Sequence, residues 1–286
     1  MRVVLGTRGS PLALAQTQLV ADRIGGDAEI RIVHTDGDRS ERPLQELGDG
    51  VFVTALENAL RSGEIDVAVH SLKDLPTEER GDLVIAAVPQ RADPRDVLVT
   101  ASRDGLAGLR AGAVVGTSSP RRAAFLRALR PDAVTRDIRG NVGTRLRKVR
   151  EGEYDGTVLA LAGLRRLGID VSDIEILDGI AWPPAPGQAA LAVQCRAADH
   201  ELRARLSLLE DEPSRAAVGA ERALLRSLGA SCTIPLGAWA RVQGFAIVMD
   251  AALALPDGVR RSHVEAADPL VVAAAAAQAL GQAAHG

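Results

Sequence analysis

One local pattern occurs twice along the chain, in the same order in each half. Residues Val3–Pro11 and Val114–Pro120 each contain an apolar, β-branched run, a Gly-Thr pair and a Ser-Pro pair that opens an amphipathic segment. Later, Gly63–Val69 and Gly152–Leu159 each lead from a Gly-Glu turn into an apolar strand. Serine is a preferred N-cap and proline fits the first helical position, so each half is predicted to repeat a strand, a turn and a helix. We expect two similar α/β lobes, with a chance match of short motifs as the alternative.

Short apolar strands alternate with helical segments, which supports this fold class. The stretch Leu83–Val88 is typical of a buried strand, whereas Leu12–Ile24 and Thr54–Arg61 indicate helices. Such alternation favours α/β units around mainly parallel sheets, whose ligands bind where strands end and helices begin. A ligand cleft enclosed by the two lobes is therefore expected.

The composition changes near Asp211, which indicates a smaller third domain. A helix begins there and runs to Leu228, two strands are joined at Pro256–Gly258, and an alanine-rich helix follows from Asp268. We predict a first lobe over residues 1–94 with a return segment at 189–208, a second lobe over 95–188, and a small α+β domain over 209–286.

Composition excludes several function classes. The 286 residues are 47% hydrophobic and 25% charged, which is typical of a globular chain. Aromatic residues make up only 2%, and 34 basic residues face 37 acidic ones, so neither base stacking nor phosphate binding favours a nucleic-acid partner. The sequence has no apolar run long enough to span a bilayer, and its two cysteines are too few for a disulfide framework. We expect a cytoplasmic protein without nucleic-acid or membrane partners.

Two arginines occupy an unusual place, the first turn of a predicted helix. Arg121 and Arg122 lie where the helix dipole is positive and where each uncompensated cation costs about 0.3 to 1 kcal/mol. An anion is expected to compensate them, because backbone N–H groups and the hydroxyls of residues 117–119 would bind a carboxylate or phosphate. Arg8, just ahead of the Ser10 cap, repeats the arrangement in the first lobe. Solvated surface arginines are the alternative at either place.

A glycine-rich turn runs into a basic helix over Arg139–Arg150. Val142, Leu146 and Val149 mark its buried stripe, and Arg145 lies at the edge of that stripe. Arg139 and Arg145 are therefore candidates for the cleft, whereas the remaining basic residues of the helix are expected on a solvated face.

Polar residues follow the apolar strand Ile65–Val69 at its carboxyl end. Asp74 could act there as a general acid or base, stabilise a developing cation, or form a salt bridge with Lys73, and the spacing does not choose among these roles. His70 is expected to be a structural histidine.

The two cysteines have different surroundings. Cys195 alternates with apolar neighbours and is interpreted as a core thiol. Cys232 lies in the small-residue loop Gly229–Pro235, which leaves room for a bulky group, with a structural thiol as the alternative. The sequence has no metal-ligand spacing, no Walker-type phosphate loop and no Ser/His/Asp order, so no metal is expected.

These segments together resemble the porphobilinogen deaminase family, also called hydroxymethylbilane synthase. The resemblance covers nearly the whole chain and is carried by Thr7–Leu14, His70–Pro76, Gly116–Ser119, Arg121–Arg122, Arg139–Leu146 and Gly229–Cys232. It implies an α/β fold with two periplasmic-binding-protein-like lobes around a cleft plus a small α+β C-terminal domain. It also implies a dipyrromethane cofactor attached to Cys232 through a thioether.

The resemblance further implies a transferase reaction and its residues. Four porphobilinogen molecules would be condensed head to tail on the dipyrromethane with loss of ammonia, and hydrolysis would release hydroxymethylbilane. Each substrate brings an acetate and a propionate, which arginine forks bind well. Asp74 matches the family's catalytic aspartate, which stabilises a substrate-derived cation. The residues expected to hold the cofactor are Arg8, Ser10, Lys73, Thr117, Ser118, Ser119, Arg121, Arg122, Arg139, Arg145 and Cys232, and those expected to hold the substrate are Phe52, Ser71, Arg166 and Gln188.

Three positions depart from the family pattern, and two other interpretations compete with it. Pro120 replaces a commoner aliphatic residue, which the first helical position tolerates. Relatives commonly carry lysine where this chain has Asp49 and Thr54, so neither is counted among the binding residues. The resemblance implies a monomer that acts on porphobilinogen and hands its product transiently to the next enzyme. A non-catalytic two-lobed protein that binds a small polyanion would explain the arginines but would give Asp74 and Cys232 no task. A nucleotide-binding enzyme with a phosphate turn at residues 117–119 would need an adenine pocket and a metal site, for which the sequence has no signature.

Overall fold

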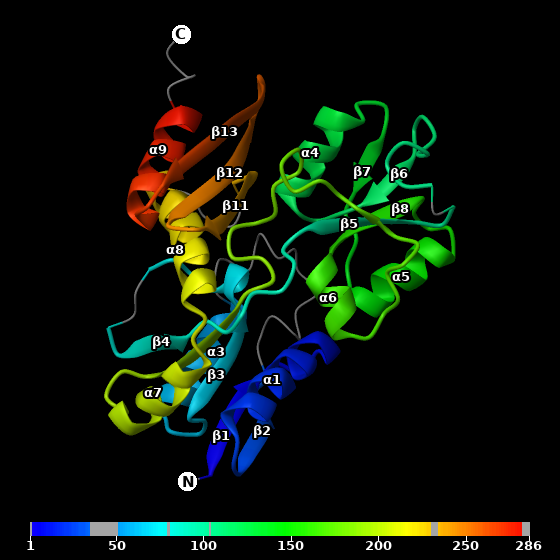
Figure 1. Ribbon diagram of the computed structural model, residues 1–286. Helices are drawn as coiled ribbons and strands as arrows, with labels where there is room; N and C mark the ends of the chain where they lie inside the picture. Colours follow the sequence, from blue (N-terminus) through cyan, green and yellow to red (C-terminus); the bar gives the residue numbers. More distant parts are fainter. Residues whose placement is uncertain (1, 35–50, 79–80, 103, 230–233, 282–286) are drawn as a thin grey trace. The chain divides into compact units, whose positions relative to one another are not determined.

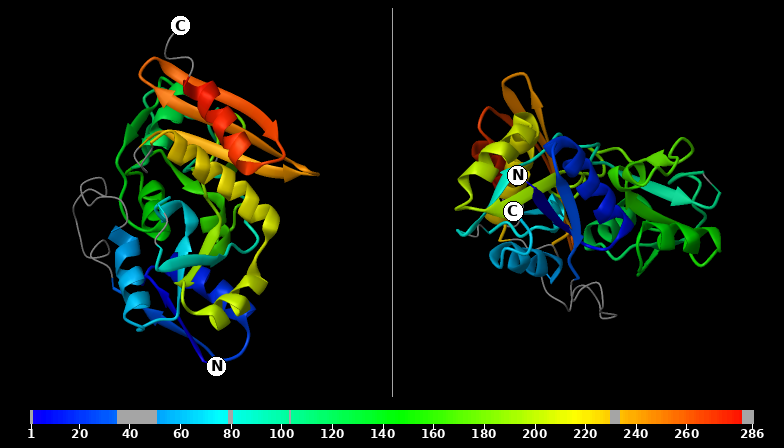
Figure 2. Two further views of the ribbon diagram at one scale, coloured as in Figure 1. Left: turned by 90° about the vertical axis from the view of Figure 1, so that its left-hand side faces the viewer. Right: turned by 90° about the horizontal axis from the view of Figure 1, so that it is seen from below.

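The computed structural model describes residues 2–34, 51–78, 81–102, 104–229 and 234–281. The described elements group into two compact units (Figure 1, Figure 2). Unit 1 comprises Met1–Ala92 and Ala189–Val218, and unit 2 comprises Asp93–Gln188 and Gly219–Gly286. Among the helices of the described ranges, none combines the length and the apolar character that a membrane crossing requires.

Unit 1 is built on a five-stranded sheet in the order β2-β1-β3-β10-β4. β1 is parallel to β2 and β3, whereas β10 runs antiparallel between β3 and β4. The strands are β1 (Val3–Thr7), β2 (Ala28–Ile32), β3 (Val67–Ser71), β4 (Leu83–Ala87) and β10 (Leu191–Arg196). The helices are α1 (Pro11–Ile24), α3 (Val51–Arg61), α7 (His200–Leu206) and the 3₁₀ helices η2 (Leu72–Asp74) and η3 (Ser207–Leu209).

Unit 2 contains a second five-stranded sheet, in the order β7-β6-β8-β5-β9. β6 is parallel to β7 and β8, whereas β5 runs antiparallel between β8 and β9. The strands are β5 (Asp96–Thr100), β6 (Val114–Gly116), β7 (Val134–Arg136), β8 (Gly156–Ala160) and β9 (Glu175–Ile176). The helices are α4 (Pro120–Leu129), α5 (Val142–Arg150) and α6 (Leu161–Arg166). One core cluster of this unit includes Phe125 and Trp182, whose rings meet edge to face with centroids 5.8 Å apart.

The two sheets share one plan, which confirms the α/β repeat predicted from the sequence. β6, β8 and β5 occupy in unit 2 the places that β1, β3 and β10 occupy in unit 1. The glycine of each Gly-Thr pair is required by close packing. A Cβ on Gly6 would lie 2.2 Å from Cδ1 of Ile65, and a Cβ on Gly116 would lie 2.9 Å from Cβ of Ile138.

The two Ser-Pro pairs open helices as predicted. The Ser10 hydroxyl accepts a hydrogen bond from the Ala13 amide (3.2 Å) at the start of α1. The Ser119 hydroxyl accepts one from the Arg122 amide (3.4 Å) at the start of α4. Each serine thus satisfies one of the amides that the first helical turn leaves without an intrahelical partner.

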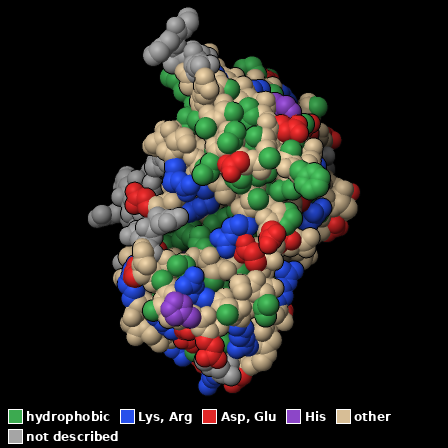
Figure 3. Space-filling view, turned by 60° about the vertical axis from the view of Figure 1, so that its left-hand side comes forward, with side chains coloured by type: hydrophobic (Ala, Val, Ile, Leu, Met, Phe, Trp, Pro, Cys, Tyr) green, Lys and Arg blue, Asp and Glu red, His purple; other side chains and the backbone are tan. Residues whose placement is uncertain are grey.

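The C-terminal part of unit 2 is a three-stranded antiparallel sheet with a helix against it. Its strands are β11 (Leu236–Gln243), β12 (Ala246–Leu255) and β13 (Gly258–Ala266), and α9 (Pro269–Gly281) packs on β12 and β13. β12 and β13 are the strands predicted on either side of the turn at Pro256–Gly258, whereas β11 was not predicted. Asp268 starts α9 by accepting the Leu270 amide (2.7 Å). Apolar side chains gather around α9 on the molecular surface (Figure 3), and this helix contains no charged residue.

Helix α8 (Glu212–Ser227) contains the boundary between the units, which falls after Val218. On its unit 2 side, Glu221 is fully buried and accepts hydrogen bonds from the amides of Gly187 (2.7 Å) and Ala240 (2.8 Å).

The sheets and helices described above confirm the mixed α/β fold class with a small C-terminal sheet. The three domain boundaries at residues 94/95, 188/189 and 208/209 stay a prediction.

Candidate functional site

A buried ion cluster joins the start of α4 to the start of β5 in unit 2. Arg121 Nη2 donates to Oδ2 of Asp96 (2.6 Å), and Arg122 Nη2 donates to Oδ1 (2.7 Å). The second Nη atoms donate to backbone carbonyls, that of Arg121 to Pro183 (2.8 Å) and that of Arg122 to Val158 (2.9 Å). The exposed fractions of the two arginine side chains are 5% and 9%, and that of Asp96 is 0%. The anion expected to compensate these arginines is therefore supplied, in the structure, by the chain itself.

Asp96 is the hub of this cluster because four side chains donate to its two oxygens. Besides the two arginines, Trp182 Nε1 donates to Oδ2 (3.0 Å) and Gln188 Nε2 donates to Oδ1 (2.8 Å). Burial alone would raise the pKa of Asp96, but the two guanidinium charges and their hydrogen bonds hold it well below its ordinary value. Asp96 is therefore a carboxylate throughout the physiological pH range.

The cluster carries more positive than negative charge. Two guanidiniums and one carboxylate leave a surplus of one positive charge, and the Nε atoms of both arginines are buried without a hydrogen-bond partner among the described residues. Arg145 adds a third cation nearby, since burial first and the charge of Arg122 second lower its pKa. Arg145 Nε donates to the Gly140 carbonyl (2.8 Å), and Arg145 makes no ion pair with a described acidic residue. Buried charges are normally paired, so this arrangement favours an additional anion.

The hydroxyls of residues 117–119 shape the turn in front of α4. Thr117 Oγ1 accepts the Ser119 amide (3.2 Å), and Ser118 Oγ donates to the Ile138 carbonyl (2.9 Å). Ser119 is the cap of α4. All three hydroxyls therefore hold backbone in place, and their contact with a ligand stays a prediction.

The other predicted residues of unit 2 differ in their exposure. Arg139 is exposed, whereas Arg166 at the end of α6 is partly buried, and burial lowers its pKa to about 10. Gln188 is buried and also donates to the Pro94 carbonyl (2.7 Å). On α5, Arg147 pairs with Glu151 (2.6 Å) on the exposed side, as expected for a solvated face.

In unit 1, Ser71, Lys73 and Asp74 lie at the carboxyl end of β3, and Arg8 directly follows β1. Asp74 ends η2 and is exposed, and its carboxylate makes no hydrogen bond or ion pair with another described residue. The backbone beneath it is fixed, because the Leu72 amide donates to the Ala190 carbonyl (3.0 Å) and the Leu75 amide to the Leu72 carbonyl (3.2 Å). Ser71 Oγ donates to Gln16 Oε1 (3.1 Å). Arg8 and Lys73 are partly buried.

Two residues interpreted as structural are buried. His70 Nε2 lies 3.0 Å from Oε1 of Gln194, and burial lowers the pKa of His70 to about 4, with the hydrogen bond to Gln194 opposing it. Cys195 is 0% exposed, and burial raises the pKa of its thiol to about 11. Both interpretations are confirmed.

Several predicted residues lie outside the described part of the chain. Cys232 and Asp49 are not described, and of Phe52 only the backbone, within α3, is described. Thr54 is exposed on α3. The roles expected of Cys232 and Phe52 therefore stay predictions.

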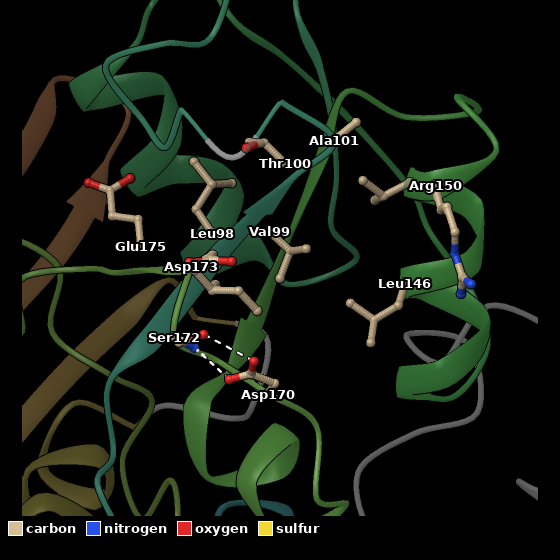
Figure 4. A pocket seen from close by; sticks show the side chains of 12 residues that line it. Leu98, Val99, Thr100, Ala101, Leu146, Arg150, Asp170, Ser172, Asp173 and Glu175 are labelled. Carbon is tan, nitrogen blue, oxygen red and sulfur yellow. Dashed lines mark hydrogen bonds between the residues drawn. The ribbon is translucent and has the colours of Figure 1, made fainter.

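A cavity of about 330 Å³ lies in unit 2 at the carboxyl end of β5, at the opposite end of this strand from Asp96. Figure 4 shows Leu146 and Arg150 of α5 on one side and Asp170 with Ser172 on the other. Asp170 accepts both the amide (2.9 Å) and the hydroxyl (3.0 Å) of Ser172. With three acidic residues and one arginine in its lining, the cavity suits a carboxylate ligand poorly. In the described ranges, no group of three His, Cys, Asp or Glu residues could hold a metal ion.

Asp96 is the site residue that sequence reasoning missed, together with the contact that Trp182 makes to it. The ion pairs join residues 25 and 26 positions apart, and the Trp182 bond spans 86 positions, so no local motif contains them. One signal was available: an aspartate opens an apolar strand at Asp96–Thr100. A buried carboxylate at that place requires cations, and the sequence had two arginines without an assigned anion.

The matching family models and the curated relatives carry the same family name. The family model described as porphobilinogen deaminase, dipyromethane cofactor binding domain, matches residues 3–204, and the model of the porphobilinogen deaminase C-terminal domain matches residues 216–285. Proteins named porphobilinogen deaminase from Roseiflexus sp. (strain RS-1), Thermus thermophilus and Mycobacterium leprae are 47%, 49% and 51% identical. The alignments cover 90%, 90% and 83% of this chain and 87%, 86% and 76% of those proteins. Among solved structures, the substrate binding protein of an amino acid ABC transporter matches with a TM-score of 0.38 and 14% identity, over 73% of this chain and 91% of that one.

Proposed function

The chain belongs to the porphobilinogen deaminase family, and on that premise we propose that the residues described above carry out the family's reaction in this protein. The enzyme condenses four porphobilinogen molecules head to tail on a covalently bound dipyrromethane with loss of ammonia, and hydrolysis then releases hydroxymethylbilane. The observation that carries the assignment of residues is the surplus positive charge around Asp96.

The ion cluster fits a group that carries several carboxylates. When bound, the dipyrromethane supplies the terminal pyrrole to which the first substrate is joined. Arg121 and Arg122 keep one more positive charge than Asp96 neutralises, and their Nε–H donors are buried without a described partner. An acetate or propionate near this cluster would supply the missing negative charge.

Arg145 and Arg166 extend the cationic surface of unit 2. Burial lowers the pKa of both, and Arg145 makes no described ion pair, so the protein holds Arg145 partly desolvated beside another cation. Such an arrangement costs free energy without a ligand and is relieved when a carboxylate binds. Arg8, Ser10, Lys73 and Arg139 bind further carboxylates in this proposal, and Phe52, Ser71, Arg166 and Gln188 contact the substrate.

Asp74 is the catalytic carboxylate of the proposal. Loss of ammonia leaves a pyrrole-derived cation, which a carboxylate stabilises by charge and by accepting a pyrrole N–H bond. Asp74 is suited to this role because its backbone is fixed at a strand end while its carboxylate is exposed and makes no described ion pair. The same carboxylate can accept the proton that leaves after the new bond forms.

Cys232 carries the dipyrromethane through a thioether in this proposal. Cys195, the other cysteine of the chain, is buried, and burial raises the pKa of its thiol. Cys195 therefore serves as the matched control. We expect wild-type protein and Cys195→Ala to be heavier than their sequences by one dipyrromethane in intact mass spectrometry, and Cys232→Ser to lack the extra mass. An unmodified wild-type mass with full activity would contradict the attachment.

The enzyme acts as a cytoplasmic monomer that hands hydroxymethylbilane transiently to the next enzyme. A reducing compartment suits this role because thioether formation consumes a free thiol. Size-exclusion chromatography with light scattering tests the monomer, and a dimer at micromolar concentration would contradict it.

A further inference from the structure

Asp96 occupies a place in the fold that does not require a charge. It is the first residue of β5 and pairs with Ala160, the last residue of β8. In unit 1, Leu191 is the first residue of β10 and pairs with Ser71, the last residue of β3. The two sheets share one plan, so Leu191 is the counterpart of Asp96. Leu191 is 5% exposed within an apolar cluster, so the fold accepts an apolar side chain there.

The charge at Asp96 is matched to the two arginines. In unit 1, Leu12 and Ala13 follow the Ser-Pro pair where unit 2 has Arg121 and Arg122. Replacing a buried ion cluster by apolar residues is often neutral for stability, so the presence of charge at all three places points to a task other than folding.

We infer that Asp96 is a positioning residue for the reaction, which holds Arg121 and Arg122 in the orientation that a substrate or cofactor carboxylate requires. This inference rests on the proposed function. Each guanidinium is fixed on two sides, by an oxygen of Asp96 and by a backbone carbonyl. Arginines ordered before the ligand arrives lose little rotamer freedom on binding, whereas arginines released from Asp96 must be ordered by the ligand.

The inference predicts an effect whose sign differs from that of simple electrostatics. In Asp96→Asn, the surplus charge of the cluster rises from one to two, which by charge alone should tighten binding of anionic porphobilinogen and lower KM. Loss of positioning should instead raise KM, by about tenfold. Intact mass gives a second readout, because the fraction of molecules that carry dipyrromethane should also fall.

Trp182→Phe is the matched control, since it removes a neutral donor from the same carboxylate and leaves both ion pairs in place. We expect its KM and its dipyrromethane content to stay within about twofold of wild type. Unchanged or lower KM with full loading in Asp96→Asn would overturn the inference, as would an equal rise of KM in Trp182→Phe.

A second pair of variants applies if Asp96→Asn does not fold. Arg121→Gln and the double variant Asp96→Asn/Arg121→Gln both lack Arg121, and they differ only in whether Asp96 holds Arg122. Positioning predicts a higher KM in the double variant, and charge alone predicts a lower one. Wild-type protein in the same assay separates the two proposals, because absence of wild-type turnover contradicts the proposed function, whereas the wrong sign in the variants contradicts only the role of Asp96.

Discussion

The two sheets place equivalent elements at the same edge, but the side chains at that edge are apolar in unit 1 and charged in unit 2. Helix α1 begins Ser-Pro-Leu-Ala and β10 begins with Leu191, whereas α4 begins Ser-Pro-Arg-Arg and β5 begins with Asp96. Three apolar residues in unit 1 thus correspond to three charged residues in unit 2, and the difference concerns all three places together. The shared fold accommodates either set, so the fold itself does not require the charged set, and the proposed positioning role of Asp96 accounts for it.

The largest effect is expected from converting unit 2 to the pattern of unit 1. The triple variant Asp96→Leu/Arg121→Leu/Arg122→Ala should lose turnover by at least about 10³, because it removes two cationic groups and their anchor. Its free energy of unfolding should stay within about 2 kcal/mol of wild type, because the loss of the acceptor shared by Trp182 and Gln188 is offset by the removal of three buried charges. Urea unfolding and a steady-state assay measure both quantities. Normal turnover of the triple variant would contradict the claim that the reaction needs the three charged residues of unit 2.

Unit 1 contributes an exposed carboxylate where unit 2 has none. Asp74 is the third residue after β3, and the corresponding third residue after β8 is Gly163. Asp74→Asn should lower kcat by at least about 10², because a charge-stabilising group is removed. Its thermal unfolding should match that of wild type, since Asp74 makes no described ion pair. Near-normal turnover would remove Asp74 from the mechanism.

A buried histidine distinguishes β3 from β8, where the corresponding residue is Leu159. Burial lowers the pKa of His70 from 6.5 to about 4, so between these values the unfolded chain binds more protons than the folded one. Stability from neutral His70 is present above pH 6.5 and is lost as the pH falls toward 4. From pH 7 to pH 5 the loss should be about 2 kcal/mol.

The variant His70→Leu gives unit 1 the residue of unit 2 at this place. Urea unfolding of the variant at pH 7 and pH 5 should show a smaller difference between the two pH values than wild type shows. An equal difference in both proteins would mean that other groups account for the acid sensitivity.

The smallest effect is expected within α5, between two arginines on different sides of one helix. Arg145→Gln should raise KM about tenfold, because Arg145 is partly buried beside Arg122 without a described acidic partner. Arg147→Gln should change KM by less than about twofold, since Arg147 pairs with Glu151 on the exposed side. Equal effects of the two substitutions would mean that α5 acts only through its net charge.

The repeated scaffold could be predicted from the sequence because its signals are local. Ser10 and Ser119 cap helices within three residues of themselves, and Asp268 caps α9 within two. The return of residues 189–208 to the first lobe was predicted, but the antiparallel insertion of β5 and β10 was not, because each lies between strands that are far from it in the sequence. The strand β11 was missed because Gly237 and Ala238 weaken its alternating pattern.

The sequence indicated candidate residues of the site better than it indicated which residues contact one another. The unusual place of Arg121 and Arg122 was visible from helix-dipole reasoning, but their bonds to Asp96 depend on how β5 enters the sheet. Asp74 and Arg145 could be named from motif and helical periodicity. What distinguishes them from their neighbours is the exposure of Asp74, the partial burial of Arg145 and the lack of a described ion-pair partner for either, which follow from tertiary packing.

The insertion of β10 between β3 and β4 bears on the order in which the chain can fold as it is synthesised. The edge strand β4 is hydrogen-bonded to β10, so the first sheet is incomplete until Leu191–Arg196 has left the ribosome. The second sheet draws all five strands from the continuous stretch between Asp96 and Ile176, which emerges earlier. The half of the molecule that begins first is thus finished later: once Ile176 has left the ribosome the second sheet can be complete, whereas the first sheet still lacks β10.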